Sequence, residues 1–164
     1  MFKRCSGLLL VLALCPVGAV SAATVSFLVL ETGVTANQAA FEIASTWENA
    51  VFDVFYGVGH IVSNAPVVRA QSISDKELPG EAVNEFYDAA RTGADYFVLV
   101  LLDYSGVKLE GPRTRPGAVT LRVFKTRPIQ MLGEKRSAPI KAAKANEELA
   151  LIKKQIQSLS TYIR

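Results

Sequence analysis

Cysteine and histidine are almost absent from this chain of 164 residues. Both cysteines, Cys5 and Cys15, lie near the N-terminus, and His60 is the one histidine. The long remainder of the chain therefore has no thiol for a disulfide, a cysteine zinc site or a nucleophile. A single imidazole cannot complete a usual zinc site unless several carboxylates converge on it. We expect no metal site, no cofactor and no catalytic residue, and we place His60 at the start of a strand.

The chain also lacks an apolar run of the ~20 residues that a membrane-spanning helix needs. Its N-terminal apolar run, residues 7–14, follows Lys3 and Arg4 and precedes small residues at 20–22 of the kind a signal peptidase reads. We expect residues 1–22 to be a signal peptide and the mature chain, without a transmembrane segment, to be exported to the bacterial periplasm. A lipoprotein leader acylated at Cys15 and an uncleaved N-terminal anchor are the alternatives.

Charge is divided unevenly along the chain. Residues 23–106 hold three basic and eleven acidic side chains, a net charge of −8, whereas residues 107–164 hold thirteen basic and four acidic ones, a net charge of +9. The two halves can neutralise each other across one domain, or the basic half can form a face for an anionic partner. Such a partner would be a membrane surface, an acidic protein or a cell-wall polymer. The export signal argues against nucleic acid.

Hydrophobic periodicity predicts alternating strands and helices. In chain order we expect a buried strand at 25–30, a helix from 35 to 57, a strand at 60–70, a helix at 81–92, a central strand at 96–102, a loop at 107–117, a strand at 118–125, a short edge strand at 129–132 and a helix at 142–163. Thr35 and Gln38 have the spacing of a capping box, and Pro66 predicts a bulge or an edge.

Three apolar patterns on the predicted helices bear on function. The first helix has an aromatic end, which either packs in the core or forms an exposed binding patch: Trp47, Phe52, Phe55 and Tyr56. The second helix has a predicted stripe: Val83, Phe86, Tyr87 and Ala90. The last helix has a stripe with alternating steps of three and four: Leu149, Ile152, Ile156, Leu159 and Ile163. This last stripe fits packing on the chain's own sheet, docking on a partner or coiled coil, or lying on a membrane surface.

These elements predict an α/β (α+β) fold. We expect a single small sandwich with a mixed sheet of four to five strands, two helices packed on it and a C-terminal amphipathic helix. The expected divisions are a signal peptide at 1–22, an α/β module at 23–140 and the helix at 141–164.

A short motif suggests a family. Gly93-Ala94-Asp95-Tyr96 follows a predicted helix and opens an apolar strand, and a basic strand, Val119-Thr120-Leu121-Arg122-Val123, comes next. This arrangement resembles the anticodon-binding-like module of bacterial envelope proteins, which includes the TolB amino-terminal domain, the curli secretion lipoprotein and the lipoprotein activators of penicillin-binding proteins. The resemblance covers roughly residues 23–133; the aromatic end of the first helix and the missing propeller domain depart from it. It implies a non-catalytic adaptor for envelope proteins.

Basic side chains gather on and beside the predicted hairpin. We expect the partner-binding residues to be Arg113, Arg115, Arg122, Lys125, Arg127, Lys135 and Arg136. Because strand residues alternate between faces, Arg122 is expected to point out of the sheet. The competing interpretation is a solvated hairpin whose charges protect an edge strand from aggregation.

Three functions therefore remain open. The first is a periplasmic adaptor that contacts an acidic envelope protein through the basic hairpin and the loop at 107–117. The second is a structural envelope component that forms a homo-oligomer through the C-terminal helix. The third is a hydrolase acting on the cell wall, for which the chain shows no nucleophile motif.

Overall fold

Two long parallel strands, β1 (Thr24–Thr32) and β4 (Tyr96–Asp103), form the centre of the fold. The computed structural model describes residues 22–35, 41–72, 76–140 and 144–163. The two strands pair from Val25–Tyr96 to Thr32–Asp103, and nearly every side chain on both is buried. Near-continuous apolar runs of this kind are typical of strands covered on both faces. The predicted central strand is therefore confirmed.

The sheet has six strands in the order β2-β1-β4-β5-β6, with β3 also paired to β1. The remaining strands are β2 (Ile61–Asn64), β3 (Val68–Ala70), β5 (Ala118–Lys125) and β6 (Gln130–Ser137). β1, β2, β3 and β4 run parallel to one another. β5 pairs antiparallel with β4, and β6 pairs antiparallel with β5 to form a hairpin. The strand predicted at 60–70 is split into β2 and β3 on either side of Pro66, because proline cannot donate to a ladder.

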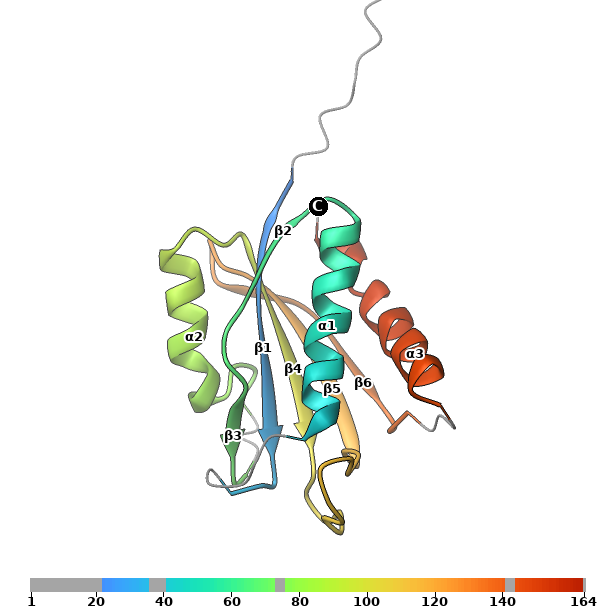
Figure 1. Cartoon of the computed structure of the whole chain (residues 1–164). Helices are drawn as coiled ribbons and strands as arrows, with labels where there is room; N and C mark the ends of the chain where they lie inside the picture. The colour runs from blue at the N-terminus through green and yellow to red at the C-terminus, as the bar shows by residue number, and fades with distance from the viewer. Residues whose placement is uncertain (1–21, 36–40, 73–75, 141–143, 164) are drawn as a thin grey trace, which may run out of the picture.

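Helices cover both faces of the sheet (Figure 1). They are α1 (Glu42–Gly57), α2 (Gly80–Arg91) and α3 (Ala145–Gln157), followed by the short 3-10 helix η1 (Ser160–Tyr162). α1 and α3 lie side by side on one face, and α2 lies on the other. The predicted α/β sandwich is confirmed. Among the described residues, no helix has the length and apolarity needed to cross a membrane.

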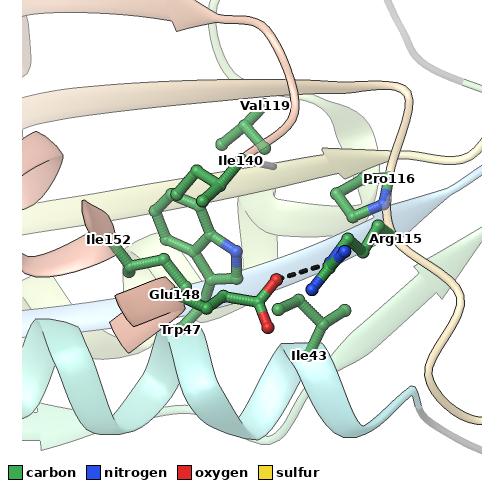
Figure 2. A pocket seen from close by; sticks show the side chains of 8 residues that line it. All are labelled: Ile43, Trp47, Arg115, Pro116, Val119, Ile140, Glu148 and Ile152. Carbon is green, nitrogen blue, oxygen red and sulfur yellow. Dashed lines mark hydrogen bonds and ion pairs between the residues drawn. The ribbon is translucent and has the colours of Figure 1, made fainter. Parts of the chain in front are cut away.

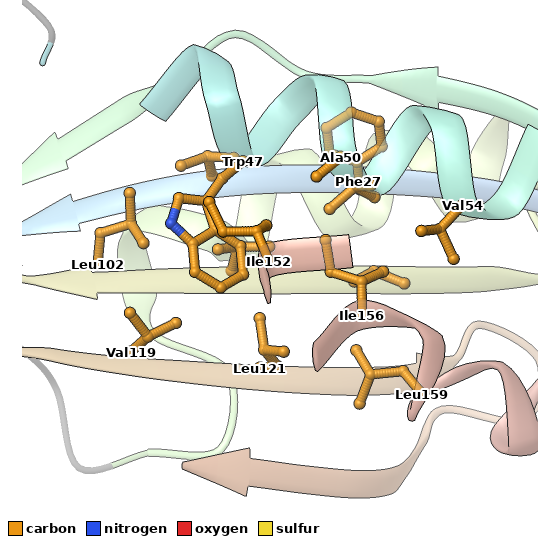
Figure 3. Packing of buried hydrophobic residues seen from close by; sticks show 14 of the residues in the cluster. Phe27, Trp47, Ala50, Val54, Leu102, Val119, Leu121, Ile152, Ile156 and Leu159 are labelled. Carbon is orange, nitrogen blue, oxygen red and sulfur yellow. The ribbon is translucent and has the colours of Figure 1, made fainter. Parts of the chain in front are cut away.

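The larger core lies between the sheet and the pair α1 and α3 (Figure 3). Trp47 of α1 is at its centre, with Val119 and Leu121 of β5 and Ile152 of α3 around it. The smaller core is built around Phe86 of α2, whose ring meets other aromatic rings edge to face. Alternation along each strand divides its side chains between these two cores.

The C-terminal helix belongs to the larger core. Ile152, Ile156, Leu159 and Ile163 are all buried in it, which confirms that the stripe packs on the chain's own fold. The ring of Tyr162 lies directly over Gly133 of β6, where a Cβ atom would collide with it. The stripe is therefore not available for a coiled coil with a second chain.

Several predicted boundaries and faces differ from the structure. α1 begins at Glu42, with Phe41 as its N-cap, so the prediction that this helix starts at Thr35 was wrong. Gln38, the second residue of the predicted capping box, lies outside the described residues. Of the stripe predicted for α2, Phe86 is buried, whereas Tyr87 is exposed; the helix buries Ala82 and Ala89 beside Phe86, because small side chains let a helix approach a sheet closely. β6 covers eight residues instead of a short edge.

Two glycines of the fold are required by close approach. Gly33 has a positive φ of 77°, and a Cβ atom there would lie 2.5 Å from the backbone nitrogen of Ser105. This contact brings the turn after β1 against the turn after β4. Gly133 has the same role between β6 and the ring of Tyr162.

We expect Ile156→Ala to lower the free energy of unfolding by about 3 kcal/mol, because it removes buried methyl groups and leaves a cavity. Leu151→Ala, at a helix position 43% exposed, should cost about 1 kcal/mol or less. Urea denaturation followed by circular dichroism measures both. Equal losses would show that α3 does not contribute its stripe to the core.

Candidate interaction surface

The seven basic residues predicted to form one surface lie at four separate places. Arg113 and Arg115 lie in the β4–β5 loop, Arg122 lies on the α2 face of the sheet, Lys125 and Arg127 lie at the β5–β6 turn, and Lys135 and Arg136 lie on β6. Lys135 pairs in register with Leu121 and shares its face toward α3, whereas Arg136 pairs with Thr120 and points to the α2 face. The structure therefore does not bring the predicted set together as one patch.

Arg113 and Arg115 lie at the end of the molecule where α1 and α3 begin. The Nε atom of Arg113 donates to Glu42 at 2.8 Å, and the Nε atom of Arg115 donates to Glu148 at 2.7 Å. A cleft of about 160 Å³ runs beside them, with Lys144 on its wall. Figure 2 shows the Arg115–Glu148 pair beside Trp47 of the core, in the lining of one small pocket. These two arginines hold the β4–β5 loop against both helices, so much of their charge is neutralised within the chain.

Arg122 does not point into solvent, and its prediction as a contact residue was wrong. It is 5% exposed, and its guanidinium donates to Glu134 at 2.6 Å and to the backbone carbonyl oxygens of Lys76 and Glu77. The hydrogen bond from Arg122 and a second from Arg136 hold the pKa of Glu134 below its usual range. Arg122 thus fastens the segment before α2 to the hairpin.

Four of the predicted cations are exposed on the hairpin and its turn. Lys125 and Arg127 are exposed, and among the described residues the structure gives them no ion-pair partner. Arg136 is 72% exposed and pairs with Glu134, and Lys135 donates to the hydroxyl of Ser158. Exposed pairs of this kind contribute little to stability, so their charge remains available to a partner.

The sheet order separates the two charges of the chain in space. Residues 23–106 form β1 to β4 with α1 and α2, which we call the acidic flank; residues 107–163 form β5, β6 and α3, the basic flank. Within the described residues, two ion pairs cross between the flanks: Arg113–Glu42 and Lys153–Asp53. Internal neutralisation by ion pairs is therefore limited, and charge changes sign along the sheet from the β2 side to the β6 side.

A buried polar cluster that the sequence analysis did not identify lies beneath Phe41. Glu31 is fully buried and accepts hydrogen bonds from Arg69, at 3.0 Å, and from the backbone nitrogen of Phe41. Burial raises the pKa of Glu31 despite these partners. Burial, with the nearby Glu31 charge, also raises the pKa of the Tyr104 phenol far above its usual range, and the Tyr104 hydroxyl has no hydrogen-bond partner. Glu31 and Tyr104 do not line the clefts and grooves described for this surface, so we assign the cluster to the fold.

The other polar residues considered from the sequence have structural roles. The Nδ1 atom of His60 accepts a hydrogen bond from the backbone of Ala23, which agrees with its predicted place at a strand start. Asp95 of the Gly-Ala-Asp-Tyr motif accepts from the backbone of Thr24, and Asp103 accepts from the backbone of Ser105. The described residues contain no group of three His, Cys, Asp or Glu side chains that could hold a metal ion.

The aromatic end of α1 divides into buried and exposed members. Trp47 and Phe55 are in the core, whereas Phe52 and Tyr56 are 41% and 65% exposed and stack on each other with ring centroids 5.4 Å apart. Core packing is therefore confirmed for Trp47 and Phe55, whereas Phe52 and Tyr56 are exposed and a binding role for them stays a prediction. Helical spacing in the sequence predicts this division, because positions 52 and 56 lie off the buried stripe that contains 47, 51 and 54.

Comparison with known proteins supports the fold. No family model matches the chain, and a search of curated proteins finds no match. Among solved structures the chain is similar to PelC from Paraburkholderia phytofirmans, a dodecamer: a leucine-to-methionine variant matches with 12% identity over 86% of this chain and 89% of PelC at a TM-score of 0.50. A second crystal form of the PelC dodecamer matches with 13% identity over 84% of this chain and 87% of PelC at a TM-score of 0.49. Protein XCC0632 from Xanthomonas campestris, of family DUF330, matches with 8% identity over 85% of this chain and 80% of its own at a TM-score of 0.32. This chain thus shares the fold of PelC.

Because Arg122 is buried, Arg122→Ala should lower the free energy of unfolding by about 3 kcal/mol; it leaves two backbone carbonyls without a donor and Glu134 without its main partner. Arg136→Ala, which removes the exposed partner of the same carboxylate, should cost about 0.5 kcal/mol or less. Chemical denaturation of the two variants tests the difference. Similar values would mean that the Arg122 contacts are not part of the folded structure.

The raised pKa of Glu31 predicts a pH dependence of stability. The folded chain binds this proton more tightly than the unfolded chain, whose Glu31 titrates near 4.5, so its contribution to stability falls as the pH rises from there through the folded pKa. Glu31→Gln removes this titration. The stability of the variant relative to the parent should therefore increase with pH across that window, measured by denaturation at a series of pH values. The same substitution at the exposed Glu81 is the control, and a difference independent of pH for Glu31→Gln would contradict the assignment.

Proposed function

We propose that this chain is an exported, non-catalytic protein-interaction module of the bacterial periplasm. Its basic flank binds an envelope protein with an acidic surface. The observation that carries this proposal is the separation of charge by the sheet order, which leaves Lys125, Arg127, Lys135 and Arg136 exposed along the β5–β6 edge of the sheet, on both of its faces and at its turn. Complementary charge of this kind guides encounter and selects partners.

The β4–β5 loop adds to this surface at one end. Arg113 is 82% exposed even while it pairs with Glu42, so an acidic partner can share its guanidinium. Arg122 is excluded from the contact because it is buried. The proposed contact residues are therefore six of the seven predicted ones: Arg113, Arg115, Lys125, Arg127, Lys135 and Arg136.

The resemblance to the anticodon-binding-like module and the predicted signal peptide support an envelope location. In the structure, Gly93 has a positive φ of 97° after α2, and Tyr96 opens β4, as the motif implies. Gly93 and Tyr96 have geometric roles, so they support a likeness of fold to the anticodon-binding-like module. The proposed envelope location of the chain depends on the predicted signal peptide. The proposal includes cleavage of the leader after residue 22, with acylation at Cys15 as the alternative.

Self-association is the second candidate function, and the exposed pair Phe52 and Tyr56 favours it. Exposed aromatic pairs are typical of contact surfaces. The PelC structures of similar fold are dodecamers. The predicted route through the stripe of the C-terminal helix is closed, because that stripe is buried, so other surfaces must form the contact.

Charge reversal tests the acidic-partner proposal. We expect Lys125→Glu/Arg127→Glu to weaken capture of an acidic envelope protein about tenfold at low salt, because two exposed cations become repulsive. Binding by the parent should also weaken at high salt. The measurement is an affinity pull-down from envelope extract followed by titration of the captured protein.

The matched control is Lys76→Glu/Arg91→Glu, which makes the same change of net charge on the acidic flank. Capture should survive in this control. Equal loss in both doubles would indicate an effect of net charge, and unchanged capture by Lys125→Glu/Arg127→Glu would remove the basic flank as the binding surface.

A further inference from the structure

The outer face of α1 carries an apolar patch with acidic neighbours, which we call the α1 patch. It consists of the stacked rings of Phe52 and Tyr56 with Glu48 and Asp53 beside them on the helix. Glu48 accepts a hydrogen bond from Asn64 of β2, so the side of α1 that carries Phe52 faces the β2 edge of the sheet. No Lys or Arg occurs on α1. Asp53 is paired with Lys153 of α3, whereas Glu48 bonds the neutral amide of Asn64, so Glu48 is the carboxylate of the patch whose charge is available to a partner.

A groove on the opposite flank has the complementary chemistry. It lies between the end of β6 and the outer side of α3, has a volume of about 460 Å³, and includes in its lining Lys135, Pro139, Ile140, Leu151, Lys154 and Ser158. Leu151 is 43% exposed in it, and the groove has no carboxylate in its lining. Grooves of ~300–1,000 Å³ are of a size that proteins use to bury ligand groups. An apolar floor with a lysine on each side fits an aromatic side chain that has carboxylates next to it.

The α1 patch and the groove cannot meet within one molecule. Asp53 pairs with Lys153, so α3 lies on the side of α1 away from β2. The groove lies beyond α3, on the β6 side. Both surfaces are in the helical layer that covers one face of the sheet (Figure 1), and each opens outward at its own flank.

We propose that the groove receives the α1 patch of a second copy of this chain. Phe52 and Tyr56 of one copy lie over Ile140 and Leu151 of the next, and Lys135 and Lys154 approach Glu48. The contact joins two different surfaces, so it is head-to-tail and repeats from copy to copy, closing into a ring where the rotation between copies allows it. The inference rests on the proposed self-association and specifies its interface.

Two variants that each remove one side of the contact provide the test. Phe52→Ala/Tyr56→Ala removes the patch and keeps the groove; Leu151→Glu/Lys154→Glu removes the groove and keeps the patch. We expect the parent to gain mass with concentration in light scattering and each variant to remain a monomer. Mixed together, the two variants should form a 1:1 dimer that grows no further, because one intact patch meets one intact groove.

Controls distinguish loss of this interface from loss of folding and from a general loss of exposed apolar surface. Circular dichroism and thermal unfolding verify that each variant is folded, and Tyr87→Ala/Leu109→Ala removes two exposed apolar side chains elsewhere, so it should assemble as the parent does. If the parent associates and the two interface variants associate equally well, this interface is wrong and self-association stands. If one variant alone still dimerises, the contact joins identical surfaces and the head-to-tail arrangement is wrong. A parent that is monomeric at every concentration overturns both the interface and the self-association, and leaves the binding of an acidic partner unaffected.

Discussion

The parallel pairing of β1 with β4 is the constraint on which the rest of this structure depends. Both strands are buried on both faces, and outside its N-terminal segment the chain has no cysteine with which to reinforce the fold. Two buried faces require helices on both sides, which α1 and α3 provide on one and α2 on the other. The parallel strands require crossovers, and these supply α1 and α2. α3 follows the hairpin and completes the larger core.

The same topology decides where the charges lie. The crossovers return β2 and β3 to one side of β1, and the hairpin β5–β6 extends the sheet on the other side of β4. The acidic first half of the chain and the basic second half therefore become opposite flanks, which meet where α1 packs beside α3 and the pairs Arg113–Glu42 and Lys153–Asp53 cross between them. A molecule with unlike flanks can contact a partner of either charge, and it can contact a copy of itself head to tail. The proposed acidic partner and the proposed self-association both follow from this polarity, and they compete for the basic flank only where their contacts overlap at Lys135.

Two ion pairs that each have one buried member join neighbouring strands, and they have different consequences. Glu31 with Arg69 joins neighbouring strands, yet burial still raises the pKa of Glu31, so the carboxylate is held at a cost. Arg122 with Glu134 crosses the hairpin and reaches the carbonyl oxygens before α2, and here the pKa of the carboxylate is lowered. The first arrangement is weak evidence for stability, because desolvation opposes it, whereas the second fixes the position of a loop.

The local sequence pattern was sufficient to predict the helices and strands and insufficient to predict which charged side chains are exposed together. Periodicity in the sequence determined the central strand at 96–102, the strand at 118–125 and the buried stripe of the last helix, because each depends on residues close in sequence. Periodicity misplaced the buried face of α2, because Val83 and Tyr87 are more hydrophobic than Ala82 and Ala89. In the structure the two alanines are buried, since small side chains let the helix approach the sheet closely. Alternation correctly put Arg122 opposite Leu121, but only the tertiary structure covers that face with Glu134 and the segment at 76–78. The sequence thus determined which residues are in strands and helices, while strand order, an outcome of long-range packing, decided which charges are exposed together.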